Sequence, residues 1–155
     1  MTIYLGSDHA GFSLKESMKE YLEKRGYSVK DLGNHARVSS DDYPDYAEKV
    51  AKAIRTPADR GILFCGSGAG VCIVANKFRG IRAVVGYDTK VAKHTRQDNN
   101  SNVLCLSGRT KDKRLAKRIV DVLLNEKFSG IARHARRLKK IAPEKQRRCM
   151  LAISW

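Results

Sequence analysis

A cysteine followed directly by a glycine-rich loop is the most informative chemical feature of this sequence. Cys65 ends an apolar run and precedes Gly66-Ser-Gly-Ala-Gly70. Alternating glycines let the backbone approach a ligand, and amides that converge before a helix form an anion site. A thiolate facing such amides is stabilised and suits proton abstraction next to a carbonyl, because the amides can hold the developing enediolate. A buried structural cysteine is the alternative interpretation.

Two further polar groups follow predicted elements. Asp8 and His9 come after the first predicted strand, and Asp98 and Asn99 come after the fourth predicted helix. Ligands of open parallel sheets bind at the carboxyl ends of the strands. We therefore expect all three groups to lie together at that edge. Asp8 has a simpler alternative role as an N-cap of the first helix.

The elements that must position these groups alternate between short strands and amphipathic helices. Strands are predicted over residues 2–5, 27–32, 61–65, 81–85 and 102–106. Helices are predicted from the capping-box pair Ser13 and Glu16 to Gly26, and over residues 43–54, 71–77, 89–96, 110–125 and 131–148. Tyr43 is expected on the inner face of the second helix. This alternation predicts an α/β fold with right-handed crossovers.

The length and composition fit one domain. The chain has 155 residues, of which 42% are apolar. We expect a single Rossmann-like three-layer domain over residues 1–155, with a five-stranded parallel sheet and an extended C-terminal helix. Residues 142–155 are expected to form a tail.

The charge is strongly positive and unevenly placed. The net charge is +15, and residues 109–148 hold fifteen Lys and Arg but only four acids. Such an excess favours anionic partners: phosphorylated metabolites, nucleic acid or a membrane surface. The alternative without a functional role is that these Lys and Arg side chains are simply exposed to solvent on two helices. Nucleic-acid binding is disfavoured because this region lacks interleaved aromatic residues for base stacking.

The sequence also predicts a reduced, cytoplasmic protein without a metal site. No apolar run approaches the roughly 18 residues of a membrane span, and we recognise no signal peptide. The four cysteines are expected to stay reduced, and they form no Cys-x-x-Cys pair or zinc-like grouping with histidine. Cys72 and Cys105 are interpreted as packing residues, and Cys149 lies in the predicted tail.

Several ordered motifs of the chain resemble those of the type B ribose-5-phosphate isomerase family, which includes galactose-6-phosphate and allose-6-phosphate isomerases. The resemblance runs in register from Ile3 to about Ile141. The motifs that carry it are Gly6-Ser-Asp-His-Ala-Gly11, Cys65-Gly-Ser-Gly-Ala-Gly70, Gly80-Ile-Arg-Ala83, Asn102-Val-Leu104, Gly108-Arg109 and Arg133-His-Ala-Arg-Arg137.

The resemblance implies catalytic roles at the glycine loop. Cys65 matches the family's base, which moves a proton between C2 and C1 of the sugar. The anion hole matches the amides of the following loop, namely Gly66, Ser67, Gly68, Ala69 and Gly70. Ser67 stands where threonine is frequent and keeps the hydroxyl, so it is also a catalytic candidate.

The resemblance also implies a substrate-binding set. Asp8 and His9 match residues that bind the sugar ring and its oxygens, and Asn99 matches a contact to a sugar hydroxyl. The phosphate-binding residues match Arg109, Arg133 and Arg137, with His134 between the last two. Family members are homodimers with active sites shared between subunits, and they need no metal or organic cofactor. Pairing of dimers into tetramers stays open.

Asp98 departs from the family pattern, because the usual ring-opening histidine stands at this position. Asp98 is still a candidate base for the sugar hydroxyl, with His9 supplying the opposing proton. The alternative is that Asp98 only orients Asn99 or His9, and that ring opening is left to His9 or to solution.

The sequence thus predicts an aldose–ketose isomerase that interconverts ribose 5-phosphate and ribulose 5-phosphate. A related isomerase with a six-carbon substrate is the first alternative, because pocket depth decides this preference. A non-catalytic nucleotide-binding or nucleic-acid-binding domain is the second.

Overall fold

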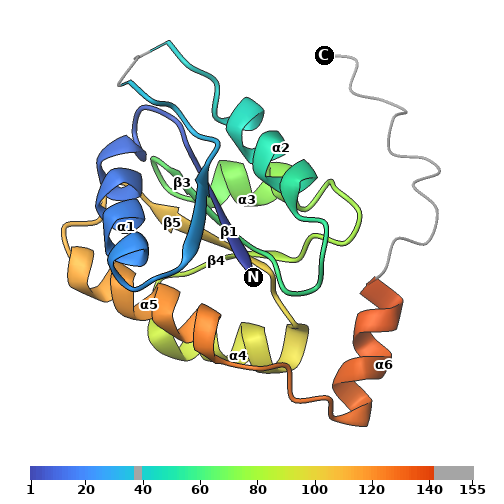
Figure 1. Ribbon diagram of the computed structural model, residues 1–155. Helices are drawn as coiled ribbons and strands as arrows, with labels where there is room; N and C mark the ends of the chain where they lie inside the picture. Colours follow the sequence, from blue (N-terminus) through green and yellow to red (C-terminus); the bar gives the residue numbers. More distant parts are fainter. Residues whose placement is uncertain (37–39, 142–155) are drawn as a thin grey trace, which may run out of the picture.

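A five-stranded parallel sheet forms the centre of the molecule (Figure 1). The computed structural model describes residues 1–36 and 40–141. The neighbouring strands lie in the order β2-β1-β3-β5-β4, and every adjacent pair is parallel. The strands are β1 (Thr2–Ser7), β2 (Ser28–Asp31), β3 (Arg60–Cys65), β4 (Ala83–Val85) and β5 (Val103–Ser107).

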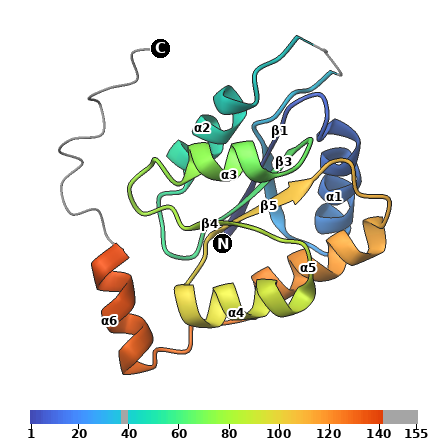
Figure 2. The same ribbon diagram turned by 180° about the vertical axis from the view of Figure 1, so that it is seen from behind.

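Helices cover both faces of this sheet (Figures 1 and 2). The helices of the described chain are α1 (Phe12–Lys24), α2 (Tyr43–Ala53), α3 (Ala69–Ala75), α4 (Thr89–Asn99), α5 (Lys113–Asn125) and α6 (Ala132–Ile141). One face packs against α1, α4 and α5, and the other packs against α2 and α3. The predicted α/β fold with three layers is confirmed. α6 stands outside these layers, beside the end of α4.

The central strand β3 explains why the predicted apolar run is continuous. All six of its residues are buried. Ile62 and Phe64 belong to the core under α1, α4 and α5, whereas Leu63 and Cys65 belong to the core under α2 and α3. A strand covered on both faces favours apolar residues at successive positions, and in β3 this run is Gly61 to Cys65, after the buried Arg60. The candidate thiol is therefore the last residue of a fully buried strand.

Several details of the helices differ from the predictions. α1 begins at Phe12 after Gly11, with no side-chain cap, so the predicted capping box of Ser13 and Glu16 is wrong. Both residues already lie within the first turns of the helix. α5 begins at Lys113 rather than residue 110, because the Asp112 carboxylate accepts a hydrogen bond from the Leu115 amide at 2.8 Å. Tyr43 is 40% exposed and is not a core residue.

The C-terminal helix is described to Ile141 only. The predicted continuation to residue 148 and the tail with Cys149 lie outside the described residues. Within residues 1–36 and 40–141, no helix has the length and apolar character needed to cross a membrane.

Candidate active site

Cys65 lies beneath the glycine loop. Its side chain is buried at the end of β3, and its Sγ accepts a hydrogen bond from the Gly68 amide at 3.1 Å. Gly68 has a φ of +82°, which favours glycine, and a Cβ there would lie 3.1 Å from the Leu106 carbonyl carbon. The loop can fold back over the thiol only because this position has no side chain. The predicted proximity of thiol and loop amides is present at Gly68.

The loop also carries the Ser67 hydroxyl, and at Gly70 it lies against a tyrosine ring. Ser67 is exposed, and its Oγ accepts a hydrogen bond from the Ala69 amide at 3.2 Å. A Cβ at Gly70 would come within 2.8 Å of the Tyr43 ring. Tyr43, which begins α2, therefore packs against the start of α3 and forms one wall beside the loop.

Asp8 and His9 follow β1, which lies next to β3. Asp8 is buried, and its carboxylate accepts a hydrogen bond from the Gly11 amide at 2.9 Å. The His9 ring is held by Asp41, whose Oδ1 lies 2.5 Å from the ring Nδ1. The same oxygen accepts a hydrogen bond from the His9 amide at 3.2 Å. The structure thus gives His9 a fixed orientation at the carboxyl edge of the sheet.

Asp41 is a site residue that the sequence predictions missed. Burial opposes ionisation of Asp41, but hydrogen bonds from His9 and Asn34 outweigh it and hold the pKa of this carboxyl below its usual value. Asn34 donates its Nδ2–H to Oδ2 of Asp41 at 2.6 Å. In the sequence, Asp41 is an acidic residue in a polar loop without a periodic pattern. Such residues are common at exposed positions, so nothing marked Asp41 as a site residue.

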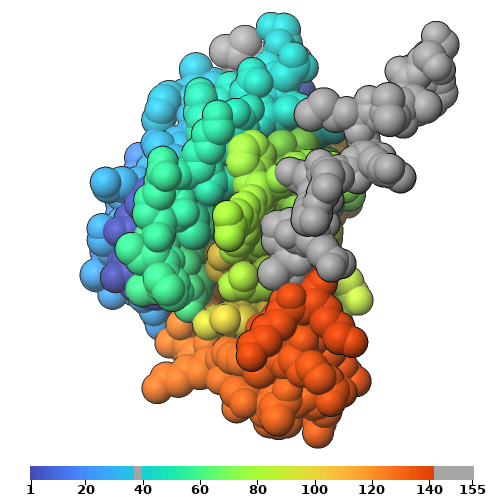
Figure 3. Space-filling view, turned by 90° about the vertical axis from the view of Figure 1, so that its right-hand side faces the viewer, coloured from blue at the N-terminus to red at the C-terminus, as the bar shows by residue number. Residues whose placement is uncertain are grey.

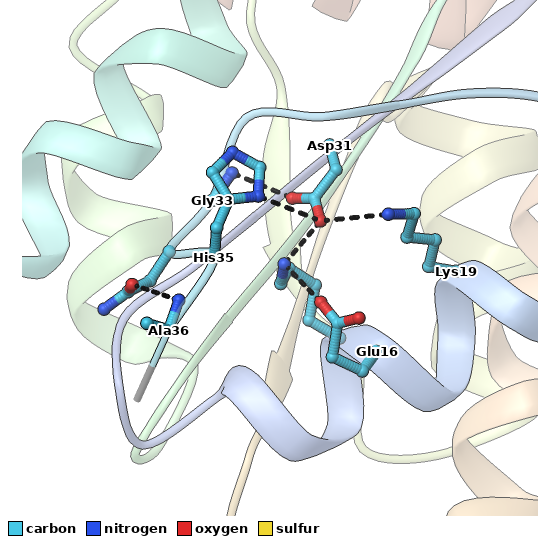
Figure 4. Close-up of polar contacts among 8 residues, drawn as sticks. Glu16, Lys19, Asp31, Gly33, His35 and Ala36 are labelled. Carbon is cyan, nitrogen blue, oxygen red and sulfur yellow. Dashed lines mark hydrogen bonds and ion pairs between the residues drawn. The ribbon is translucent and has the colours of Figure 1, made fainter. Parts of the chain in front are cut away.

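A buried lysine fixes the beginning of the loop that carries Asn34 and Asp41. The Lys15 side chain is fully buried in α1, and its Nζ lies 2.5 Å from Asp31 and 2.6 Å from Glu16. Figure 4 shows Asp31 between α1 and the loop, where its carboxylate also accepts a hydrogen bond from the Gly33 amide at 3.0 Å. A buried ammonium needs such partners, so this contact ties the end of β2 to α1.

Arg109 follows β5 and reaches the glycine loop from the other side. A Cβ at Gly66 would lie 3.2 Å from Nη2 of Arg109, so the guanidinium packs on the loop backbone. The Ser107 hydroxyl donates a hydrogen bond to the Gly66 carbonyl at 2.8 Å. Together these residues form a first half-site at the carboxyl edge of the sheet. Its members are Asp8, His9, Cys65 to Gly70 and Arg109.

Asp98 and Asn99 do not join this half-site, and the prediction that they lie at the carboxyl edge is wrong. α4 begins after β4 ends and returns across the sheet to the point where β5 begins. Asp98 and Asn99 belong to its last turn, so they lie at the amino edge. The prediction ended the helix at residue 96 and overlooked that a crossover helix leads back to the opposite edge.

The remaining predicted residues gather around Asp98 as a second half-site. Its members are Asp98, Asn99, Arg133, His134 and Arg137. His134 Nδ1 lies 3.3 Å from Asp98 Oδ1, and Arg133 donates its Nε–H to His134 Nε2 at 3.2 Å. Arg133 and Arg137 are exposed on α6, one helical turn apart. Figure 3 shows α6 at the lower end of the molecule, away from the cyan segment before α2 at the upper end.

A pocket of about 520 Å³ adjoins the second half-site. It lies between α6 and the segment from the end of α3 to β4, and Asn99 lines it. Its apolar walls include Phe78, Ile81, Leu138 and Ile141. Leu138 and Ile141 come from α6, so the helix forms one side of an apolar groove.

The two half-sites are too far apart for one chain to complete a site. The length of a six-residue strand such as β3, roughly 17–20 Å, separates the two edges of the sheet. This exceeds the length of a five-carbon sugar phosphate. His9 and Asp98 therefore cannot act on one substrate within a single copy of the chain. Within residues 1–36 and 40–141, no group of three His, Cys, Asp or Glu side chains is arranged to hold a metal ion.

Comparisons with known proteins match nearly the whole chain. The family model described as Ribose/Galactose Isomerase matches residues 3–141. Ribose-5-phosphate isomerase B of Escherichia coli is 44% identical over 147 residues, which are 94% of this chain and 97% of the relative. The structure of Clostridium thermocellum ribose-5-phosphate isomerase B has a TM-score of 0.86 at 45% identity, covering 91% of this chain and 95% of that one.

A solved relative also contains a sugar phosphate. Ribose-5-phosphate isomerase B of Mycoplasma genitalium with bound ribulose-5-phosphate has a TM-score of 0.82 at 42% identity. The match covers 90% of this chain and 93% of that one.

Proposed function

The chain belongs to the Ribose/Galactose Isomerase family, and we propose that within it the chain interconverts ribose 5-phosphate and ribulose 5-phosphate. It is an aldose–ketose isomerase of sugar phosphates, and hence an intramolecular oxidoreductase. One observation carries the proposed mechanism. The buried thiol of Cys65 lies under a loop whose Gly68 amide donates to the sulfur.

We assign the proton transfer to Cys65. In the open-chain aldose, the Cys65 thiolate removes the proton from C2, and the electron pair moves into a C1–C2 double bond while O1 becomes negative. The loop amides stabilise this enediolate, and the exposed hydroxyl of Ser67 on the same loop contributes a further contact. Return of the proton from Cys65 to C1, with transfer of the O2 proton to O1, gives the ketose.

The binding residues divide between the ends of the substrate. Asp8 and His9 are assigned to the sugar ring and its oxygens, and Asn99 to a hydroxyl. The assigned phosphate ligands are Arg109, Arg133, His134 and Arg137. Guanidinium groups suit this task because their planar donor forks match phosphate oxygens.

A second copy of the chain completes each site in this proposal. The first half-site of one copy faces the second half-site of its partner, so a symmetric pair forms two identical sites. The separation of Cys65 from Arg133 supports this arrangement. The apolar groove lined by Phe78, Leu138 and Ile141 is proposed as the surface that the second copy covers. Size-exclusion chromatography with light scattering tests it, and a monomer that is fully active would contradict it.

The preference for ribose 5-phosphate is tested with a panel of aldose phosphates. We expect the highest kcat/KM for ribose 5-phosphate and lower values for galactose 6-phosphate and allose 6-phosphate. A preference for a six-carbon substrate would assign the chain to the alternative branch of the family. Nucleic-acid binding is a separate alternative, and it would weaken steeply with salt through counterion release.

We further propose that residues 1–155 act as one domain in the cytoplasm, without a metal or organic cofactor. Isomerisation needs no external oxidant, because the hydrogen lost from C2 is returned to C1. Activity that persists after dialysis against a chelator is the expected result, and loss that is restored by a metal would contradict it.

A further inference from the structure

We propose that Asp98 is a positioning residue that acts through His134 on the phosphate-binding Arg133, and that it does not exchange protons with the sugar. The inference rests on the proposed function, because it takes Arg133 and Arg137 as phosphate ligands. It gives the residue that departs from the family pattern a defined role.

The hydrogen bonds around His134 fix which ring nitrogen carries the proton. Arg133 can only donate, so its contact of 3.2 Å makes His134 Nε2 an acceptor. A neutral imidazole with Nε2 as acceptor carries its proton on Nδ1. That Nδ1–H is hydrogen-bonded to Ser129 Oγ at 3.1 Å, and Asp98 Oδ1 lies 3.3 Å from the same nitrogen. The negative charge of Asp98 beside Nδ1 therefore adds to the Ser129 hydrogen bond in favouring the tautomer of His134 that holds the Arg133 guanidinium.

The same contact anchors the helix that carries both arginines. His134 is the one buried residue of α6 within the described chain, with its side chain 8% exposed. The preceding segment is tied to α4 by the Ser129 amide, which donates to the Gln97 carbonyl at 2.9 Å. Because α6 lies outside the layers of the fold, the groups around His134 set its direction. Asp98 thus influences where Arg133 and Arg137 are presented.

Charge also argues against contact between Asp98 and the substrate. Asp98 lies next to the assigned phosphate ligand Arg133, where a carboxylate turned towards the phosphate would repel it, whereas a carboxylate turned towards His134 compensates Arg133. A general base must come within about 2.6–3.2 Å of the atom that carries the proton it takes. The Asp98 carboxylate, with 42% of its side chain exposed, lies 3.3 Å from His134. His9, which Asp41 orients in the other half-site, is then the group left for opening the sugar ring.

The test compares Asp98→Ala with Asp98→Asn. Asparagine keeps an oxygen of similar position beside His134 Nδ1 but cannot act as a base at neutral pH. We expect Asp98→Ala to raise KM for ribose 5-phosphate about tenfold and to weaken calorimetric binding of inorganic phosphate by a similar factor, with kcat within about twofold of wild type. For Asp98→Asn, KM, kcat and the dissociation constant of inorganic phosphate should each stay within about threefold of the wild-type value.

Glu126→Gln is the matched control, because Glu126 lies at the same junction and accepts a hydrogen bond from Gln97 rather than from His134. It should leave KM and phosphate binding unchanged. In an Arg133→Ala background, Asp98→Ala should cost less than it does in the wild type, because only its effect on Arg137 remains.

Three results would overturn the proposal. They are a kcat loss of more than about tenfold in both Asp98→Asn and Asp98→Ala, unchanged phosphate binding in Asp98→Ala, and full additivity with Arg133→Ala. Phosphate binding is measured without turnover. A wild type that binds phosphate through this relay but isomerises no sugar would refute the proposed function and leave this inference standing.

Discussion

Asp41 and His9 form a carboxylate–imidazole pair with 2.5 Å between Oδ1 and Nδ1, at the same edge of the sheet as Cys65. Nδ1 is the nitrogen engaged by Asp41, and no group of the described residues hydrogen-bonds Nε2. An imidazole held this way presents Nε2 to a ligand in a fixed direction. The pair is therefore suited to move a proton at the sugar ring.

Replacement of Asp41 by Ala should impair ring opening. Without the carboxylate the His9 ring loses its orientation, and we expect kcat for ribose 5-phosphate to fall at least about tenfold. Turnover of an analogue that cannot close its ring should fall much less. Steady-state kinetics on both substrates measure the difference, and equal losses would show that Asp41 has only a general structural role.

Cys65→Ala should abolish isomerisation, because it removes the proposed base. Sugar-phosphate binding and the thermal unfolding temperature should change little, since the substitution removes one sulfur at the edge of the core. Exchange of the C2 proton with solvent should disappear together with turnover. Substantial activity or exchange in this variant would remove Cys65 from the mechanism.

Arg133→Ala or Arg137→Ala should raise KM and cost on the order of 1.5–3 kcal/mol in binding, as for other hydrogen bonds to charged groups. Lys at either position should be an incomplete substitute, because it lacks the planar fork. Competition by inorganic phosphate provides the measurement. If both alanine variants bind normally, the phosphate must lie elsewhere, with Arg109 the first residue to examine.

Strands and helices were predictable because their patterns are local. The continuous apolar run before Cys65 predicts a strand buried on both faces, and β3 confirms it. The capping-box spacing of Ser13 and Glu16 misled because the turn at Gly11 starts the helix earlier. Sequence spacing identifies side chains that could cap a helix. It does not show which backbone amide each of them hydrogen-bonds.

The assembly of the site was less predictable, because it depends on contacts between distant segments. Asp41 reaches His9 across 32 residues of sequence. Asp98 was assigned to the wrong edge, since its place follows from the return of α4 across the sheet. His134 lies in a strongly basic helix, where nothing in the pattern marks it as the buried residue.

Asp59, which belongs to neither half-site, provides a pH-dependent stability prediction. Burial opposes ionisation of Asp59, but hydrogen bonds from the backbone amides of Thr56 and Thr2 outweigh it and lower its pKa. Its Oδ2 accepts from the Thr56 amide at 3.0 Å, and its Oδ1 accepts from the Thr2 amide at 3.2 Å.

Because the pKa of Asp59 is lower in the folded state, the unfolded chain binds the proton first as the pH falls. The stabilisation is present above the unfolded pKa of about 4 and is lost as the pH falls through the folded value. Asp59→Asn should therefore be less stable than wild type at pH 7, and the gap should narrow below about pH 4. Urea unfolding at several pH values measures it, and a gap independent of pH would contradict this account.

The central claim, that one copy supplies Cys65 and its partner supplies the phosphate-binding arginines, is tested most directly by subunit complementation. Cys65→Ala and the double variant Arg133→Ala/Arg137→Ala should each be nearly inactive alone at low substrate concentration. Co-expressed in equal amounts with random pairing, half of the dimers are mixed, and each mixed dimer has one site with both halves intact. The account predicts about a quarter of the wild-type activity, and a mixture as inactive as its components would contradict it.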